Sequence, residues 1–388
     1  PVFLCIMALV FFLTFTVGDV VKGWFEIGLD WAFEAARTAL TALGASGWVC
    51  SLVVDGIMSG VGGILTFLPN IFILFLALAF LEDSGYMARV AYVMDGIMGK
   101  VGLSGKAFLP MVLGFGCTVP AVMASRTLEN EEDRKKTILL TPFMSCSARL
   151  PIYVLFASVF FGKYAMIVAF SLYALGLIVA ILLALIIGKV WKTDTKVPLL
   201  IELPDYKVPN PRTIRIYVWE KVKDYLTKAG TTIFVASIVS WFILNYNFQG
   251  MTSDVTNSFG AMIGKVLAPV LVPAGLGAWQ IVVALISGLS AKEVVISSFS
   301  VLYGVNNISS PEGMATLSQA LGTIDFGPLN AYALMVFCLL YPPCVATLAT
   351  IRKETHSTSW TLKMVVFQLV LAYAAAVLVF QAGRLLGL

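Results

Sequence analysis

Three cysteines lie where glycine or proline interrupts an apolar segment. Cys117 is preceded by two glycines and followed by a proline, Cys146 lies between two serines, and Cys344 directly follows two prolines. A thiolate is a soft ligand that suits Cu(I) and Zn(II) and, less strongly, Fe(II). The shared position at breaks therefore favours a metal path, although any single free cysteine also packs well as a small apolar group. Neighbouring residues that could add oxygen or thioether ligands are Thr118, Met144, Ser145 and Ser147.

The remaining cysteines, Cys5, Cys50 and Cys338, lack this context, and we interpret them as packing residues. The sequence holds no CxxC pair, which argues against a zinc ribbon or a disulfide framework. His356 is the single histidine, so a multi-histidine metal site within the chain is excluded. The chain has neither a GxSxG nor a GxxxxGK[ST] motif, which excludes nucleotide binding through a P-loop.

Charged residues also interrupt apolar segments. Lys292 and Glu293 break the apolar run 279–303, and Arg149 lies within the apolar segment that begins at 137. Ionisable groups at membrane depth usually face a transport pathway or one another. Lys292 and Glu293 thus predict either a carboxylate on a path, with the lysine nearby, or a structural pair that locks a hairpin. The same two readings hold for Arg149, whose long side chain could instead reach the surface.

Glu82 and Asp83 end the apolar run 61–81. Two carboxylates at this point could collect cations at the mouth of a path. The simpler interpretation is a solvated helix end, and the sequence favours it.

The composition indicates that the chain lies in a membrane. Of the 388 residues, 59% are hydrophobic and only 12% are charged, whereas an average soluble domain is about 45–50% apolar and about 25% charged. The net charge of +4 is small and the positive residues do not form one stripe, so nucleic acid is not an expected partner. The chain opens at Pro1 inside an apolar run without a signal-peptide pattern, and we interpret it as a piece of a longer protein.

Apolar runs of about 20 residues predict membrane spans. Residues 18–60 carry charges three or four apart and predict a helix at the membrane interface. Residues 189–228 are basic and proline-rich, and predict a cytoplasmic loop leading into a helix near Tyr217. The runs 107–125 and 279–303 are interrupted in the middle. The predicted spans are 1–17, 61–81, 137–161, 164–188, 229–245, 329–350 and 360–385.

Loop charge predicts the orientation. Segments 126–136, 189–228 and 351–363 are basic and belong in the cytoplasm, whereas 246–258 and 304–328 contain no Lys or Arg and belong outside. These positions agree with the span order only if both interrupted runs are re-entrant hairpins, one from each side. Paired interrupted segments of this kind point to a transporter binding site, because freed backbone groups must line a buried or wet cavity. The alternative is that the glycines and prolines merely kink packed helices.

The predicted fold is therefore an all-α, polytopic transmembrane helical bundle that contains an inverted repeat. Its expected divisions are the amino-terminal spans and interfacial helix (1–106), a first repeat (107–188), a cytoplasmic loop (189–228), a connecting span and external segment (229–278), and a second repeat with the last span (279–388).

The motifs at these breaks resemble the Gate regions of the FeoB family of ferrous iron transporters. Leu113 to Leu128 and Pro142 to Pro151 are similar to the first Gate, and Ser287 to Val295 and Leu339 to Thr347 to the second. Further similar stretches are Glu82 to Arg89, Gly102 to Phe108 and Trp219 to Leu226.

This resemblance implies Fe²⁺ uptake across a bacterial inner membrane by a multi-pass protein. It implies that Cys117, Cys146 and Cys344 line the ion path. It also implies an amino-terminal GTPase domain, with GTP and Mg²⁺, outside this chain, a small FeoA-like accessory protein, and a homo-oligomer as partners. No cofactor is expected in the chain itself, which is a transporter region rather than an enzyme.

Two other functions stay open. The Gate regions also look like parts of concentrative nucleoside transporters, so an ion-coupled carrier of nucleosides or other small organic solutes is the second hypothesis. Such a site should offer Asn, Gln and Glu, whereas here only Glu293 fits and the breaks hold Cys, Ser and Met. The third hypothesis is a GTP-dependent sensor that binds metal without transporting it.

Overall fold

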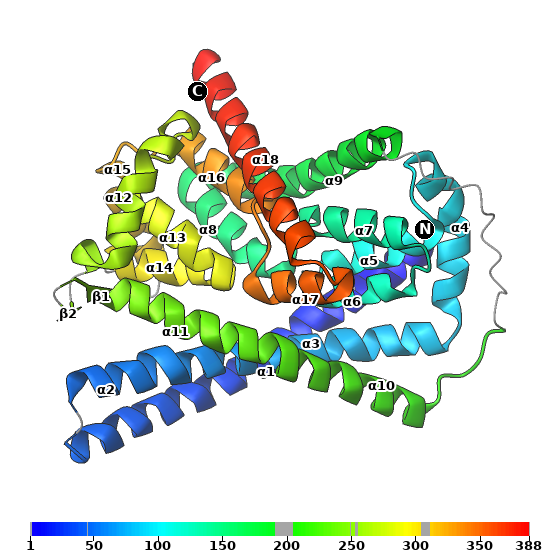
Figure 1. Cartoon of the computed structure of the whole chain (residues 1–388), viewed down its shortest axis with the longest axis horizontal. Coiled ribbons are helices and arrows are strands. Elements are labelled where there is room, and N and C mark those ends of the chain that lie inside the picture. Colours follow the sequence, from blue (N-terminus) through cyan, green and yellow to red (C-terminus); the bar gives the residue numbers. More distant parts are fainter. Residues whose placement is uncertain are drawn as a thin grey trace.

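The computed structural model describes residues 2–44, 46–190, 205–248, 250–252, 255–303 and 311–387, nearly all of them helical (Figure 1). Within these ranges the strands are β1 (Tyr246–Asn247) and β2 (Gly250–Met251), a short antiparallel hairpin in which Tyr246 lies opposite Met251. The prediction of an all-α fold is confirmed.

The amino-terminal part is a hairpin of two long helices. Helix α1 (Val2–Ala42) runs without a break through the predicted boundary at residue 17. The chain returns through α2 (Gly47–Ser51), a π-helical turn at Leu52–Met58, and α3 (Ser59–Asp83), which packs along α1 (Figure 1). The predicted division at residue 17 is therefore wrong, because 18–42 continue the helix that holds the predicted span 1–17. Its charges spaced three or four apart mark one side of a helix but do not end it.

Helix α1 is longer than a bilayer needs. At about 1.5 Å per residue, 41 residues extend roughly 60 Å, about twice the hydrocarbon thickness. Two helix pairs are bent sharply: α3 turns by 82° into α4 (Tyr86–Lys100), and α12 (Phe259–Leu271) by 101° into α13 (Trp279–Ser290).

Three helical stretches of the described residues are long and apolar enough to cross a membrane, or up to five if each bent pair is one span. The three are Glu131–Lys189, Pro328–Thr355 and Thr358–Leu385, which contain the predicted spans 137–161, 164–188, 329–350 and 360–385. The predicted spans 1–17 and 229–245 fall in longer helices, α1 and the continuous rod of α10 (Pro211–Asp224) and α11 (Thr231–Asn245). Helix α10 contains Tyr217, as predicted, whereas 191–204 of the predicted loop lie outside the described residues.

Both interrupted runs are two short helices joined by a three-residue break that contains one extended residue, Cys117 in the first and Ala291 in the second. In the first, α5 (Phe108–Gly114) and α6 (Thr118–Ala124) flank 115–117. In the second, α13 and α14 (Val294–Tyr303) flank 291–293. Each is followed by a helix pair that is itself broken, so the order of elements repeats as predicted. The later elements are α7 (Glu131–Leu140), α8 (Leu150–Phe161) and α9 (Ala165–Val190) in the first half, and α15 (Pro311–Gly322), α16 (Pro328–Leu340), α17 (Val345–Thr355) and α18 (Thr358–Leu385) in the second.

Buried cations fill the breaks between α7 and α8 and between α16 and α17. Arg149, only 1% exposed, donates Nη1 to the carbonyls of Pro142 (2.8 Å) and Met144 (3.3 Å). Lys292, 3% exposed, donates Nζ to the carbonyl of Pro342 at 2.5 Å and lies 3.1 Å from the centroid of the Tyr341 ring. Arg149 thus bonds inside the protein and does not reach the surface. Lys292 joins the break between α13 and α14 to the break between α16 and α17.

The breaks also pack closely on one another. A Cβ on Gly114 would lie 2.9 Å from the Cβ of Met144, closer than side chains pack. Ser147 donates both its backbone N–H (3.1 Å) and its hydroxyl (2.8 Å) to the carbonyl of Gly116. The two breaks of the first half are therefore held together at the Gly116 carbonyl, which accepts these hydrogen bonds from Ser147.

The orientation predicted from loop charge gives a first test. Phe248, 85% exposed between β1 and β2, belongs to the segment predicted outside, and the exposed Glu131 begins α7 in a segment predicted inside. In intact cells a membrane-impermeant maleimide should label Phe248→Cys and leave Glu131→Cys unlabelled until the cells are opened. Modification is read at each position by peptide mass spectrometry, with the parent protein as the background. The reverse pattern would exclude the inverted repeat.

The second test removes a buried donor. Lys292→Met leaves the Pro342 carbonyl without its ammonium partner, which should cost about 1–3 kcal/mol of stability and lower the thermal unfolding midpoint of the detergent-solubilised protein by at least about 3 °C. Lys163→Met, at an exposed turn, is the matched control and should leave the midpoint unchanged. An unchanged midpoint in Lys292→Met would show that this bond does not hold the break.

Candidate ion-binding cavity

The four breaks meet at one cavity of about 400 Å³ in the middle of the protein. The breaks of the first half contribute Cys117 and Cys146, and those of the second half contribute Glu293 and Cys344. Segments more than 200 residues apart in the sequence thus form a single site, as the repeat of interrupted helices requires. The other polar lining residues are Thr14, Lys22, Glu26, Asn70, Thr118, Ser147, Arg149, Tyr225, Ser290, Lys292 and Thr347.

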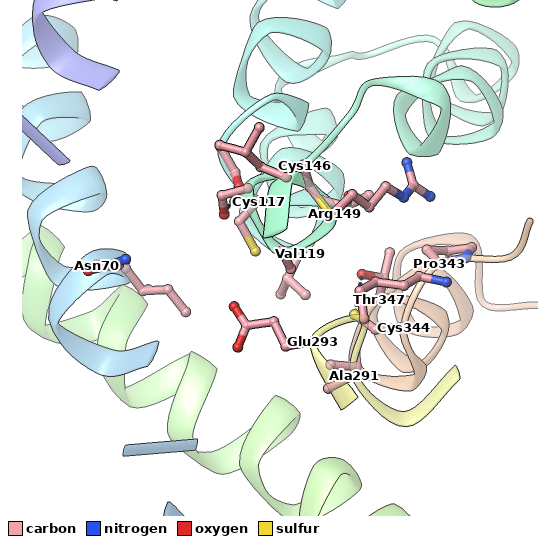
Figure 2. Close-up of a pocket in the computed structure, with 18 of the residues that line it drawn as sticks. Asn70, Cys117, Val119, Cys146, Arg149, Ala291, Glu293, Pro343, Cys344 and Thr347 are labelled. Atoms are coloured by element: carbon pink, nitrogen blue, oxygen red, sulfur yellow. Dashed lines mark hydrogen bonds between the residues drawn. The ribbon is translucent and has the colours of Figure 1, made fainter. Parts of the chain in front are cut away.

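The three predicted thiols face this space. Cys117, Cys146 and Cys344 are each partly buried, and the sulfurs of Cys117 and Cys344 lie on facing sides of the cavity (Figure 2). The Cys344 sulfur is 3.2 Å from the hydroxyl of Thr347. Each cysteine ends or begins an extended break, and Cys117 and Cys344 directly precede the helices α6 and α17. The break geometry therefore carries the sulfurs away from the helix surfaces and into the cavity.

Glu293 brings a carboxylate to the same place. Figure 2 shows its side chain reaching into the open space near Cys117 and Cys344. The neighbouring Lys292 turns the other way, onto Pro342 and Tyr341. The adjacent acid and base therefore have different roles: one lines the cavity, whereas the other supports its wall. A carboxylate beside thiols gives the site both a hard oxygen donor and soft sulfur donors.

The other predicted ligands divide into two groups. Thr118 and Ser147 line the cavity, although Ser147 already donates to Gly116. Met144 and Ser145 do not line it: both are about 1% exposed, Met144 packs in the main apolar core, and the Ser145 hydroxyl donates to Tyr153 at 3.1 Å. Among the residues that the structure describes, no three His, Cys, Asp or Glu side chains are grouped closely enough to hold a metal ion. The thiols and Glu293 surround the cavity without forming a compact ligand set.

Glu82 and Asp83 lie at a different cavity, of about 280 Å³, at the corner between α3 and α4. Asp83 pairs with Lys207 (2.8 Å) and accepts the backbone N–H of Asn210 (2.7 Å), the residue that caps α10. Burial and the nearby Glu82 carboxylate raise the pKa of Tyr217 above its ordinary value. These carboxylates fasten α10 to the end of α3, which sequence spacing does not reveal.

Sequence reasoning missed the side of the cavity formed by α1 and α3. Asn70 follows Pro69 within the apolar helix α3, and a polar residue beside a helix-breaking proline is the signal that would have identified it. On α1, Lys22 and Glu26 lie 3.7 Å apart as an ion pair and line the same cavity. Their spacing had suggested only an interfacial helix.

Two family profiles match the chain. The family profile described as "Nucleoside recognition", Gate, matches residues 64–160 and 226–358, more than half of the chain. The profile described as "Ferrous iron transport protein B C terminus" matches residues 169–221. No solved structure shows a significant match.

Several curated relatives align with nearly the whole chain. A protein of Staphylococcus aureus (strain MSSA476) named "Fe(2+) transporter FeoB" is 43% identical over 99% of this chain, which covers 57% of that protein. A Methanocaldococcus jannaschii protein of the same name is 42% identical over 97% of this chain and 56% of its own length. A Porphyromonas gingivalis protein named as a fusion of Fe(2+) transport protein A and FeoB is 37% identical over 99% of this chain and 50% of its own length.

The chain thus spans little more than half the length of these curated relatives. The Gate matches cover all four breaks, and the C-terminal profile covers α9 and most of α10. The broken helices that build the cavity are therefore the part of the chain that the Gate profile describes, and the chain belongs to the FeoB family of Gate-containing, multi-pass membrane proteins.

Proposed function

We propose that this chain is the permeation region of a ferrous iron transporter and that Fe²⁺ passes through the cavity at the four helix breaks. One observation carries the proposal: three thiols and the Glu293 carboxylate, from the breaks of both repeats, line a single cavity. The names of the relatives, "Fe(2+) transporter FeoB", support the same substrate.

The donor types fit a borderline metal ion. Mg²⁺ and Ca²⁺ prefer all-oxygen sites, whereas sulfur ligands favour softer first-row ions. In this proposal Glu293 attracts a partly hydrated Fe²⁺ by charge, and Cys117, Cys146 and Cys344 replace part of its water shell. Thr347 and Thr118 supply neutral oxygens beside the thiols. Such a set selects against Mg²⁺ and Ca²⁺ but does not by itself reject Zn²⁺.

The whole protein would add what this chain does not supply. We propose that a GTPase domain using GTP and Mg²⁺ controls the path, that the protein lies in the cytoplasmic (inner) membrane, and that a small FeoA-like protein assists it. The fusion of Fe(2+) transport protein A with FeoB in the Porphyromonas gingivalis relative supports the last partner. A homo-oligomer is a further part of this proposal.

The first experiment measures anaerobic uptake of radiolabelled Fe²⁺ and of uridine by cells that make the full-length protein. With Cys117, Cys146 and Cys344 all changed to Ser, Fe²⁺ uptake should fall at least about tenfold, because hydroxyls are poorer ligands than thiolates for this ion. The matched control changes Cys5 and Cys50 to Ser, and should transport normally. Uptake is normalised to membrane abundance.

Four outcomes bear on the proposal. Loss of Fe²⁺ uptake in the triple variant alone supports a thiol path. Unchanged uptake in that variant would exclude the thiols as ligands. Uptake of uridine without Fe²⁺ would support the nucleoside carrier, and metal binding without flux would support the sensor.

The second experiment tests the carboxylate. Glu293→Gln keeps the shape of the side chain and removes its charge, and should raise the half-saturating Fe²⁺ concentration about tenfold, the equivalent of about 1.4 kcal/mol. Glu312→Gln, at an exposed acid in the first turn of α15, is the matched control. Equal half-saturation in Glu293→Gln and the parent protein would contradict a role for Glu293 in attracting the ion.

A further inference from the structure

A second cavity, of about 300 Å³, lies directly beside the thiol cavity. The two cavities share the lining residues Val119, on α6, and Tyr225, which follows α10. These two side chains therefore stand between the spaces. The remaining lining residues of the second cavity are Met123, Arg126, Asp224, Thr227, Thr231, Ala349, Thr350, Lys353 and Glu354.

The second cavity lies on the side of the protein that loop charge assigns to the cytoplasm. Its walls contain Arg126, Asp224 and Lys353, and each comes from a different one of the three segments predicted to be cytoplasmic. Besides Tyr225, seven polar or charged residues line this cavity, including Thr227 and Glu354, and their side chains can bind water. The second cavity thus has the position and the polarity of a cytoplasmic chamber.

The partition between the cavities is apolar and tightly packed. Tyr225 is 5% exposed and Val119 is 4% exposed, and both belong to one apolar cluster with Ala346 and Leu74. Cys117 and Cys344 pack against the same cluster. The Tyr225 hydroxyl is the single polar side-chain group of the two residues that the cavities share, and one hydroxyl replaces little of the water shell of a divalent cation. This layer therefore opposes the passage of a hydrated ion.

An ion pair joins the two repeats next to the partition. Arg126, just after α6, binds Glu354, near the end of α17, through two hydrogen bonds, of which Nε to Oε2 measures 2.7 Å. Glu354 is only 7% exposed whereas Arg126 is 42% exposed, so solvent reaches one side of this pair. Arg126 follows α6, which carries Val119, and Glu354 lies on α17, which begins directly after Cys344. The pair therefore holds these two helices together beside the partition.

Tyr225 lies at an irregular turn between two helices. It begins the π-helical turn Tyr225–Gly230, which joins α10 to α11, and π-helical turns are rare and concentrate at functional sites. Helix α10 is fastened at its other end, through Lys207 and Asn210, to Asp83. A shift of that corner would therefore be transmitted along α10 to the ring of Tyr225.

We propose that Tyr225 is the cytoplasmic gate of the ion path, that Val119 is the surface against which it closes, and that the second cavity is the exit chamber. The Arg126–Glu354 pair stabilises the closed state. The direction of transport in this proposal rests on the proposed function, whereas the closed partition does not depend on which solute moves.

The test measures access to Cys117 from the cytoplasmic side. Inside-out vesicles containing the full-length protein are treated with a membrane-impermeant maleimide, and the modification of Cys117 is followed by peptide mass spectrometry. Tyr225→Ala should raise the rate at least about tenfold, whereas Tyr225→Phe, which keeps the ring, should react at the rate of the parent protein. In right-side-out vesicles the three proteins should react equally.

A second variant protects the test against misfolding. Tyr225→Leu keeps an apolar side chain in the partition and should give an intermediate rate if the alanine variant fails to reach the membrane. Parent-like rates in whichever of these variants is correctly inserted, or an equal increase in Tyr225→Phe, would overturn the gate.

Fe²⁺ uptake in the same preparations separates the two proposals. If Tyr225→Ala opens Cys117 to the reagent while the parent protein moves no Fe²⁺, the gate stands and the iron proposal fails. If the parent protein moves Fe²⁺ and Tyr225→Ala leaves Cys117 protected, the iron proposal stands and the gate fails.

Discussion

The structure depends on satisfying the backbone groups that four broken helices release at membrane depth. An unpaired carbonyl in hydrocarbon costs several kcal/mol, and a helix interrupted at Pro142 or Pro342 exposes carbonyls that its own N–H groups no longer reach. The protein meets this need with two buried cations, Arg149 on the Pro142 and Met144 carbonyls and Lys292 on the Pro342 carbonyl. Each cation bonds a proline carbonyl in the break of one repeat. The two repeats thus use the same kind of contact, although Arg149 comes from the broken pair that it stabilises and Lys292 comes from the interrupted run that precedes it in the same repeat.

This solution places positive charge close to a cavity proposed to take a cation. The conflict is limited because both cations direct their N–H groups at carbonyl oxygens, and Lys292 also lies against the Tyr341 ring. Glu293 then supplies the opposite charge at the cavity itself. The other acid that lines the cavity, Glu26, is paired with Lys22, so Glu293 stands nearest the thiols as the carboxylate of the breaks.

The sequence predicted what depends on local chemistry. The interruptions at Cys117, Cys146, Lys292–Glu293 and Cys344 were found because glycine, proline and charge are rare inside apolar segments, and the structure brings all four to one cavity. The sequence did not predict the continuous helix α1 or the ion pair between Asp83 and Lys207, because both depend on packing between distant segments. Met144 and Ser145 illustrate the same limit. A break presents only some of its side chains to the cavity, and its backbone path, which spacing does not determine, decides which ones.

The loose arrangement of ligands is consistent with a path rather than a storage site. Conduction requires binding that is favourable enough for an ion to leave water and weak enough for it to leave again. In the described residues, no three acidic, thiol or imidazole groups converge on one point, although three thiols and Glu293 surround the same space. An ion moving among them would exchange one or two ligands at a time. The breaks that hold these groups are anchored by Arg149 and Lys292, so the change that opens the path must come from elements outside the breaks. The π-helical turn after α10 is such an element, because it carries Tyr225 to the edge of the cavity while its own helix is fastened at the far end.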